Sequence, residues 1–341
     1  MHSKLQEIFF KNNLVIKRFS ETKKEWGEVI LSGTTDNCFF DVDSVEYFEE
    51  YFKNNMHLEN LSQVVFHNSR PVAVFVLEVD HDPRNKVITS NGGFVKPPVY
   101  LRELPKKVIK KLNKSLLSYI DYLVSKQFKC CFDYEFDGGG CSDWYIALVT
   151  KCKIKELTHN LYVDLRFSLD DIKLNFRKSF RPLVHKGIKL WDVKIIDYGC
   201  LDIAQRFIEY RDFHIFVSGR KTRSDRSWDI QAAMVKNGKA FVVSIFDCDE
   251  LIGFGFFSKN DSFCSYGVGV YDRERFGQPL GHVVQFKAIE YMKKLGLTKY
   301  QLGVRFFSSQ QKLASEKEIS ISHFKEGFAN LILPSVVFEQ C

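Results

Sequence analysis

Two stretches of the chain show the same arrangement of apolar and polar positions. Residues 62–78 and 239–257 each contain two runs of β-branched and aromatic residues separated by a short polar segment. The polar segments, at residues 68–71 and 247–250, have the composition of turns. We therefore expect two β-hairpins, one in each half of the chain.

Each hairpin is followed by a segment with helical periodicity. In residues 104–126 and 280–295, apolar side chains recur every three or four positions, so each segment forms a helix with one apolar stripe. Pro279 suits the start of the second helix, and Gly296 suits its end. The hairpin-then-helix order repeats at a separation of about 175 residues, which indicates a duplicated domain rather than a short repeat.

The expected fold class is α/β (α+β), with two domains that each contain a mixed, mostly antiparallel sheet flanked by helices. A chain of 341 residues exceeds the usual size of one domain. We place the boundary between a strand ending near Thr150 and a basic segment starting at Lys173, which gives domains of residues 1–155 and 156–341. No segment carries three clean heptads, so no coiled-coil arm is expected.

The composition limits the class of protein. Hydrophobic residues make up 45% and charged residues 27%, as in soluble globular proteins. No apolar run reaches the roughly 18 residues that span a bilayer, and the polar start lacks the zones of a signal peptide, so we expect a cytoplasmic protein without a transmembrane segment. The nine cysteines form no C-x-x-C pair, which favours free thiols over disulfides or a zinc site.

Two basic segments are candidates for phosphate binding. Residues 173–189 hold six Lys or Arg and no acid, and residues 219–228 combine Arg with Ser and Thr. Arginine forks suit phosphates and carboxylates, and the net charge of +7 fits a nucleotide, coenzyme A, a nucleotide-linked sugar or tRNA as partner. A solvated charged face and a mobile basic loop are the alternatives. The candidate ligands are Arg177, Arg181, Lys186, Arg220 and Arg223.

A glycine-containing turn leads into the second amphipathic helix. Free N–H groups and the helix dipole make such a start an anion site. Gln278 and Gly281 fit an incomplete version of the acetyltransferase pyrophosphate loop, Gln/Arg-x-x-Gly-x-Gly/Ala, but Val283 occupies the last small position. Many helices begin with Gly and Pro, so this signal is weak on its own.

Polar side chains elsewhere are further candidates. Residues 318–328, with Lys325, form either a strand or a final helix, and their polar residues could simply lie at the surface. Asp137 belongs to a glycine-rich acidic loop, which could be flexible or could bind an amine. The chain contains no G-x-S-x-G elbow, H-E-x-x-H motif or Walker loop, so it has no hydrolase or NTPase signature.

Together these segments resemble the FemAB-like family, the nonribosomal peptidyl and aminoacyl transferases of bacterial cell-wall synthesis, within the GNAT-fold acyltransferase superfamily. The resemblance covers residues 160–330 in the family's order, and the first half of the chain matches only in layout. Gln301-Leu302-Gly303 departs from the family's Tyr-Asp-x-x-Gly-like run. The matching pieces are Tyr162-Val163-Asp164-Leu165, Leu169-Asp170-Asp171-Ile172, Arg177-Lys178-Ser179-Phe180-Arg181, Lys186-Gly187, Gly238-Lys239-Ala240-Phe241, Tyr266-Gly267, the Gly277 to Gly281 turn, Ala288-Ile289-Glu290-Tyr291, Tyr300 to Gly303, and Phe324-Lys325-Glu326-Gly327-Phe328.

The resemblance implies two tandem GNAT-like domains and an acyltransferase that forms an amide, with direct attack of an acceptor amine on the donor carbonyl. It implies phosphate contacts from Arg177, Arg181 and Lys186, with Arg220 and Arg223 as second candidates. Gln278 and Gly281 would face a donor pyrophosphate or a tRNA-end phosphate. Lys325 would neutralise the charge of the tetrahedral intermediate. The candidates for the general base stay open, and a substrate-assisted route needs none: His282, His323, Glu318 and Asp137.

The resemblance leaves three functional hypotheses open. The first is transfer of an aminoacyl group from aminoacyl-tRNA to a nucleotide-linked or lipid-linked cell-envelope precursor, such as a peptidoglycan peptide. The second is acyl-CoA-dependent N-acylation of an amino sugar of a surface glycan. The third is non-catalytic nucleotide or glycan binding on a GNAT scaffold. In the enzymatic cases the donor is a co-substrate, and we expect no tightly bound cofactor, no metal and no DNA partner.

Overall fold

The computed structural model describes residues 1–35, 37–53, 57–310 and 314–340, which divide into two units. The first unit comprises Met1–Leu157 together with the chain from Pro334 onward, and the second comprises Thr158–Leu333. We expected the boundary after residue 155, two residues before the observed one. The expectation that the second domain extends to the C-terminus is wrong. Strands β9 (Lys153–Asp164) and β15 (Leu331–Glu339) each run from one unit into the other.

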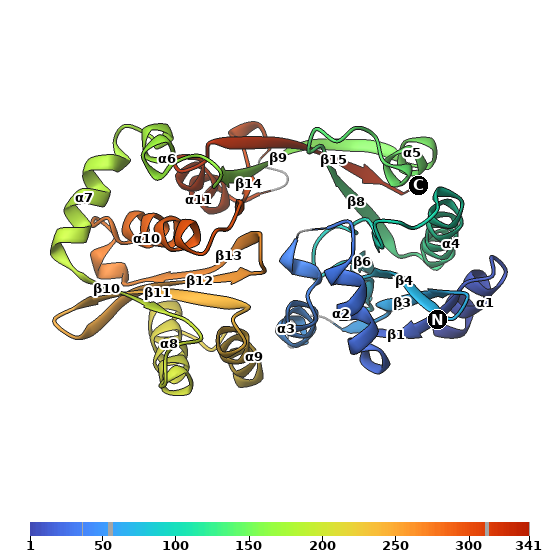
Figure 1. Ribbon diagram of the computed structural model, residues 1–341, viewed down its shortest axis with the longest axis horizontal. Coiled ribbons are helices and arrows are strands. Elements are labelled where there is room, and N and C mark those ends of the chain that lie inside the picture. Colours follow the sequence, from blue (N-terminus) through green and yellow to red (C-terminus); the bar gives the residue numbers. More distant parts are fainter. Residues whose placement is uncertain (36, 54–56, 311–313, 341) are drawn as a thin grey trace. The chain divides into compact units, whose positions relative to one another are not determined.

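The second unit contains a mixed sheet with helices on both faces (Figure 1). Its sheet order is β10-β11-β12-β13-β14-β9, and all neighbours are antiparallel except β13 and β14. In chain order its remaining elements are α6 (Leu169–Asn175), α7 (Phe180–Leu190), β10 (Asp192–Ile196), α8 (Ile203–Ser218), α9 (Asp225–Lys236), β11 (Ala240–Asp247), β12 (Glu250–Lys259), β13 (Phe263–Tyr271), α10 (Leu280–Lys294), β14 (Lys299–Arg305) and α11 (Glu316–Glu326).

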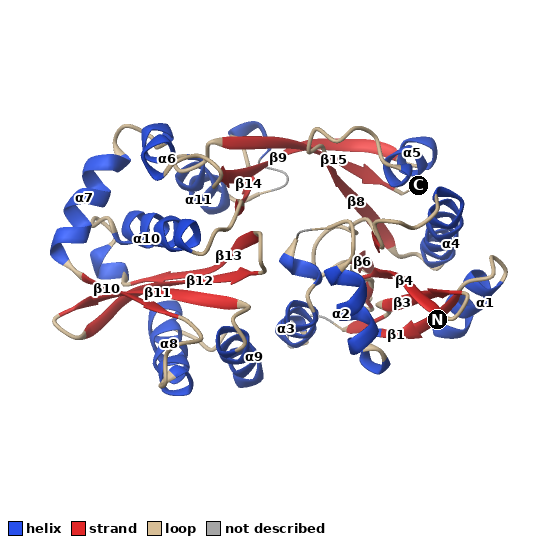
Figure 2. Cartoon of the chain, in the orientation of Figure 1, coloured by secondary structure: helices blue, strands red, loops and turns tan. Residues whose placement is uncertain are grey.

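The two faces of this sheet are covered by different helices. Because side chains alternate along a strand, Phe241, Val243 and Ile245 of β11 point to one face, where they pack in a core with α10. Ser244 points to the other face and shares a 2.7 Å hydrogen bond with Tyr210 of α8. Figure 2 shows α7 and α10 on one side of β10 to β13, and α8 and α9 on the other.

The first unit is built from an antiparallel sheet, β1-β3-β4-β7, and a mixed group of strands, β15-β8-β6-β5-β2, in which only the β6–β8 pair is parallel. Helices α1 and α4 pack around one core, and α2 and α3 around another. In chain order its elements are α1 (His2–Phe10), β1 (Val15–Arg18), α2 (Lys23–Leu31), α3 (Val42–Phe52), β2 (Leu58–Asn60), β3 (Gln63–His67), β4 (Arg70–Phe75), β5 (Glu78–Asp80), β6 (Val87–Thr89), β7 (Val99–Tyr100), α4 (Lys106–Val124), β8 (Lys129–Glu135) and α5 (Asp143–Lys151).

The hairpins and helices expected from the sequence are confirmed. β3–β4 and β11–β12 are antiparallel hairpins, and positive φ angles at Asn68 and Ser69 and at Cys248 and Asp249 form their tight turns. The two long helices are α4 and α10, and each lies along the chain between the two members of a parallel strand pair: β6 and β8 for α4, with β7 also intervening, and β13 and β14 for α10. The duplicated plan therefore holds in three dimensions.

The strand expected near Thr150 is wrong, because residues Asp143–Lys151 form helix α5. The Ser142 hydroxyl accepts a hydrogen bond from the Tyr145 N–H and caps the helix start. Trp144 and Leu148, four positions apart, are buried on its inner face. No helix within the described ranges has both the length and the apolar character needed to cross a membrane.

Candidate functional site

The parallel strands β13 and β14 pair over three residues only. Phe263, Cys264 and Ser265 face Lys299, Tyr300 and Gln301. Beyond these pairs β13 stays hydrogen-bonded to β12 as far as Tyr271, while β14 follows β9 through a register shift between Gln301 and Gly303. The two strands therefore part after their third pair, and their separated ends can hold side chains from a third element.

The side chain of Lys325 in α11 lies at this point of separation. Its Nζ is 5.1 Å from the centre of the Tyr266 ring, on the residue that follows the last paired position of β13. A Cβ placed on Gly303 of β14 would lie 3.1 Å from the same Nζ. Gly303 has a φ of +123°, a conformation that favours glycine, so β14 gains both its bend and room for the ammonium from this residue.

The ammonium group of Lys325 is poorly compensated. No hydrogen-bond acceptor and no carboxylate within 4.0 Å pairs with it in the described part of the chain. Burial lowers the pKa of Lys325 to about 8, because an ammonium loses hydration there. A partly desolvated cation without a fixed anion is suited to meet a negative charge that develops on a bound substrate.

Tyr266 of β13, whose ring lies against the Lys325 ammonium, is paired with a second tyrosine of the same strand. Tyr266 and Tyr271 share a hydrogen bond of 3.0 Å. Burial raises the pKa of both phenols, so both stay protonated, and the hydroxyl that accepts in this bond keeps its own proton for another acceptor. Gly269 lies between them along the strand, and a Cβ there would overlap the Tyr266 hydroxyl. The glycine is thus needed for the close approach of the first tyrosine to the strand.

The start of α10 adds backbone N–H groups to the same region. Pro279 precedes the helix, no side chain caps it, and the N–H groups of Gly281 and His282 donate to no backbone carbonyl among the described residues. A Cβ on Gly281 would lie 3.1 Å from the Phe324 ring and 3.6 Å from that of Tyr271. The helix start therefore meets the end of β13 and the helix that carries Lys325.

The imidazole of His282 is enclosed by aromatic rings. Its centre lies 4.4 Å from that of Phe180, 5.0 Å from that of Phe324 and 6.0 Å from that of Phe328. Burial, and to a lesser degree the positive charge of Arg177, lower the pKa of His282 to about 4. The ring is therefore neutral at pH 7, and a base this weak is poorly suited to remove a proton from an ammonium group.

A polar cluster fixes α11 against β14 next to Lys325. Arg305 is 9% exposed and donates through Nε to the Glu326 carboxylate at 2.9 Å and through a terminal nitrogen to the Ser322 hydroxyl at 3.2 Å. His323 Nδ1 lies 3.1 Å from the same carboxylate. Arg177 donates to the His323 carbonyl at 2.8 Å. The cluster ties the strand and the helix together on either side of the lysine.

The remaining predicted residues of the second unit face solvent. Arg181 is exposed and donates to the Leu174 carbonyl at 2.6 Å, and Lys186 and Gln278 are exposed. Glu318 is also exposed and forms the capping box of α11 with Ser315, and these hydrogen bonds lower its pKa. A carboxylate used in this way holds a helix start, which leaves it poorly suited to act as a base.

Three predicted residues are not brought to this region. Arg220 and Arg223 belong to the connection between α8 and α9, whose helices cover the opposite face of the sheet (Figure 1). Arg223 is only 4% exposed and stacks on Trp228 at 3.8 Å, as a packing residue does. Asp137 lies in the first unit, where its carboxylate accepts a hydrogen bond from the Gly139 N–H within an exposed loop.

Sequence reasoning did not single out Tyr266, Tyr271 or Arg305 as site residues. A signal for the tyrosines exists, because Gly267 and Gly269 alternate between them in a strand, where glycine marks a close approach. Arg305 carries no such signal, since the side chains to which it donates, those of Ser322 and Glu326, are 17 and 21 residues away along the chain. No group of three or more side chains able to hold a metal ion occurs within the described ranges.

Comparisons with known proteins support the fold. No described protein family and no curated protein matches the sequence. Solved structures that are similar include FemX (TM-score 0.62, 13% identity, 93% of this chain and 95% of that one). They also include the C-terminal domain of a putative lysylphosphatidylglycerol synthetase from Agrobacterium fabrum (TM-score 0.63, 11%, 94% and 92%) and L-PGS from Bacillus licheniformis (TM-score 0.56, 13%, 86% and 91%). The chain therefore has the fold shared by FemX and these proteins, as the FemAB-like resemblance led us to expect.

Proposed function

We propose that this protein is an acyltransferase that joins an aminoacyl group, delivered on tRNA, to an amine of a cell-envelope precursor. The observation that carries the proposal is the uncompensated Lys325 ammonium between the separated ends of β13 and β14, beside two protonated tyrosines. The shared fold with FemX and with lysylphosphatidylglycerol synthetases supports aminoacyl transfer over other acyl transfers.

The chemistry needs no covalent enzyme intermediate. The acceptor amine forms a bond to the ester carbonyl carbon, and the carbonyl oxygen becomes an oxyanion. The Lys325 ammonium stabilises that oxyanion, and a tyrosine hydroxyl can donate to it. When the intermediate collapses, the C–O bond of the ester breaks, and the proton of the attacking amine ends on the released tRNA hydroxyl, directly or through water. His282 is too weak a base for this transfer, so a substrate group is the better proton acceptor.

The start of α10 is the proposed phosphate site of the donor. The N–H groups of Gly281 and His282 are open, and the helix dipole adds positive potential there. Three basic residues supply charge around it. They are Arg177, which donates to the His323 carbonyl of α11, and the exposed Arg181 and Lys186 of α7. Phosphate contact by Arg177, Arg181 and Lys186 is part of the proposal, whereas Arg220 and Arg223 belong to the α8–α9 connection and are left out of it.

A second candidate is acyl transfer from acyl-CoA to an amino sugar. The same open N–H groups favour it, because a pyrophosphate fits a helix start. The packing at Val283, the last small position of the pyrophosphate loop, counts against this candidate. Val283 is fully buried, and a Cβ on Gly187 of α7 would overlap its side chain, so α7 packs tightly against the first turn of α10.

Both proposed reactions use donors made in the cytoplasm, which is where we place the protein.

The test is a transfer assay with both donor classes. Purified protein is incubated with a mixture of radiolabelled aminoacyl-tRNAs or with radiolabelled acetyl-CoA, and with UDP-linked muramyl peptide or UDP-linked amino sugars as acceptor. Amide-linked label on the muramyl peptide from tRNA is the expected result. Label on the amino sugar from acetyl-CoA would replace the proposal with the second candidate.

Ligand binding separates a wrong substrate from a missing activity. A ligand that binds only the native state raises the melting temperature. A thermal shift with the acceptors but no transfer from either donor would favour the third hypothesis, in which the protein binds nucleotides or glycans without catalysis. Lys325→Met serves as the low-activity variant, and Lys317→Met on the exposed face of the same helix serves as its match.

A further inference from the structure

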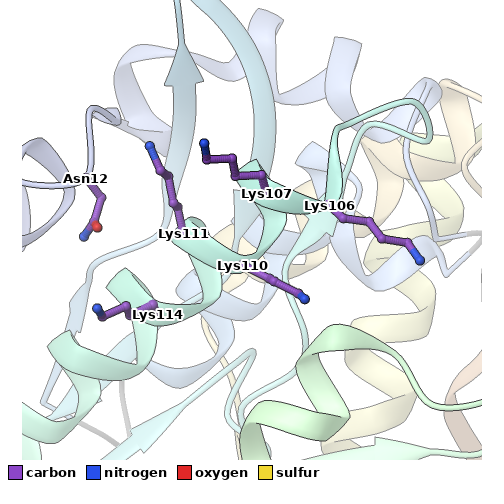
Figure 3. Close-up of a pocket in the computed structure, with 6 residues that line it drawn as sticks. All are labelled: Asn12, Lys106, Lys107, Lys110, Lys111 and Lys114. Carbon is purple, nitrogen blue, oxygen red and sulfur yellow. The ribbon is translucent and has the colours of Figure 1, made fainter.

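The N-terminal half of α4, in the first unit, lines a basic hollow. The hollow has a volume of about 530 Å³, and one asparagine and five lysines surround it (Figure 3). The lysines occupy two neighbouring rows of the helix and span about 12 Å along its axis, at a rise of about 1.5 Å per residue. We call the five lysines the lysine stripe: Lys106, Lys107, Lys110, Lys111 and Lys114. Asn12 completes the lining.

The charges of the lysine stripe are not balanced by the protein. In the described part of the chain, Lys110 alone has a carboxylate within 4.0 Å, that of Asp143 at 3.9 Å. The first turn of α4 contains no acidic residue, so the lysines face the positive end of the helix dipole. Like charges three and four positions apart also repel one another along a helix. This arrangement costs helix stability that a bound anion would restore.

Packing on the opposite face lets α4 tolerate this charge. Leu112, Leu116 and Ile120 are buried in the core of the first unit, so the helix does not depend on its charged face. Asn12, at the end of α1, is held against α4 by a 2.9 Å hydrogen bond to Ser115. The hollow is thus bounded by ordered elements on both sides.

We propose that the lysine stripe binds the phosphodiester backbone of RNA. Five ammonium groups spread over about 12 Å match a row of phosphates better than a single phosphate. Among the described residues no aromatic side chain lines the hollow, so the contact is to the backbone and not to stacked bases. The lining that the structure describes contains no apolar residue either, whereas helices that dock on lipid surfaces place apolar residues beside their basic ones.

The choice of RNA over other polyanions rests on the proposed tRNA-linked donor, but the binding test needs no transfer reaction. A fluorescein-labelled RNA hairpin without an acyl group is titrated with the full chain at several salt concentrations, and fluorescence anisotropy gives the affinity. The RNA affinity can therefore be interpreted even when the transfer assay fails. The expected wild-type affinity falls steeply with salt, because bound phosphates release counterions.

The variant replaces all five lysines of the stripe by Gln, and the matched control replaces five scattered exposed lysines: Lys24, Lys126, Lys236, Lys294 and Lys317. Both change the formal net charge from +7 to +2 (7 − 5), so global charge is held equal. The stripe variant should bind at least about tenfold more weakly, with a salt slope lower by about 0.7 to 0.9 for each lysine that contacts a phosphate. The control should bind within about twofold of wild type.

Folding and alternative partners are checked in the same series. Removing like charges from one helix face should leave the melting temperature unchanged or higher, and a five-Arg variant of the stripe should keep the affinity. Equal weakening in stripe variant and control, or no weakening in either, would overturn the proposal. Sedimentation with phosphatidylglycerol vesicles in the absence of RNA binding would also overturn it and would assign the stripe to a lipid surface.

Discussion

At the scale of single residues, the charge state of Lys325 determines the expected activity. Burial lowers its pKa to about 8, so the ammonium that stabilises the oxyanion is lost as pH rises through that value. We expect kcat to fall above pH 8. Lys325→Met should lower kcat by about 100-fold or more, the usual effect of losing one oxyanion donor, and the remaining activity should lack that falling limb.

Lys317→Met is the control for this variant, since Lys317 lies exposed on the same helix. It should keep both the rate and the pH profile of the wild type. A Lys325→Met enzyme with an unchanged profile would show that the limb belongs to another group, and the role proposed for this lysine would be lost.

His282 affects stability in acid and not the rate of proton transfer. Its folded pKa is about 4 against an ordinary 6.5, so the folded state disfavours the proton. Its stabilising contribution is complete above pH 6.5 and is lost as pH falls toward 4, with a slope of at most about 1.4 kcal/mol per pH unit. His282→Phe keeps a ring in the aromatic cage and should flatten this dependence.

Urea unfolding at pH 7 and pH 5 measures the effect. His214 also has a pKa lowered to about 4 by burial, so part of the acid sensitivity should persist in the single variant. A free energy of unfolding that falls equally in wild type and His282→Phe would show that this imidazole is protonated without cost.

The conformation of Gly303 links one residue to the position of Lys325. Gly303→Ala must either hold a strained positive φ or straighten β14, and its Cβ would crowd the ammonium. We expect a loss of about 1 to 3 kcal/mol in the free energy of unfolding and a lower kcat. Gly27→Ala in α2, where nothing lies within 4 Å of the new Cβ, is the control: it should leave kcat unchanged and should not lower the free energy of unfolding.

At the scale of elements, α11 and β14 are coupled through Arg305 and Glu326, whose ion pair of 2.9 Å is largely withdrawn from water. Arg305→Met leaves a carboxylate with weaker partners and should destabilise the protein by about 2 to 3 kcal/mol. Glu326→Gln should cost less. In a double-mutant cycle measured by urea unfolding, the two changes should show a coupling of about 1 kcal/mol or more, and purely additive effects would contradict a direct pair.

The elements of this region were predictable to different degrees from the sequence. The α10 stripe and its Pro279 and Gly296 boundaries identified the helix, since these signals are local. The strand–helix ambiguity of residues 318–328 was resolved by the capping box of Ser315 and Glu318, a signal present in the sequence. The Glu318 carboxylate was also a candidate general base, because residue type alone does not distinguish a helix cap from a catalytic carboxylate.

The geometry of the candidate site depends on contacts that sequence spacing does not determine. Lys325 was identified as a charge-stabilising candidate only through the family resemblance, and its position beside Tyr266 follows from the separation of β13 and β14. That separation depends on strand pairing with two different neighbours, β12 and β9. Arg223 shows the opposite case, because its basic, hydroxyl-rich surroundings predicted a phosphate ligand, whereas packing on Trp228 buries it.

At the scale of the whole molecule, the chain repeats one plan twice and then returns to its first unit. Each unit contains a β-hairpin and, between two strands that pair in parallel, a long helix: α4 in the first and α10 in the second. The last strand, β15, pairs with β8 of the first unit, with Phe338 opposite Phe132. Cutting the chain at one internal point therefore does not separate the two units, which is why a boundary drawn from sequence alone assigned the C-terminus wrongly.

This return predicts that the C-terminal strand stabilises the first unit and not the second. Phe338 is fully buried in the core of the first unit, so Phe338→Ala should cost about 3 to 5 kcal/mol. Hydrogen exchange followed by mass spectrometry should show faster exchange in α4 and β8, while β11 and β12 keep their protection. Phe216→Ala, at a side chain that is 74% exposed on α8, is the control and should change neither unit. Equal loss of protection in both units would mean that they unfold as one cooperative body, because destabilising one would then destabilise the other.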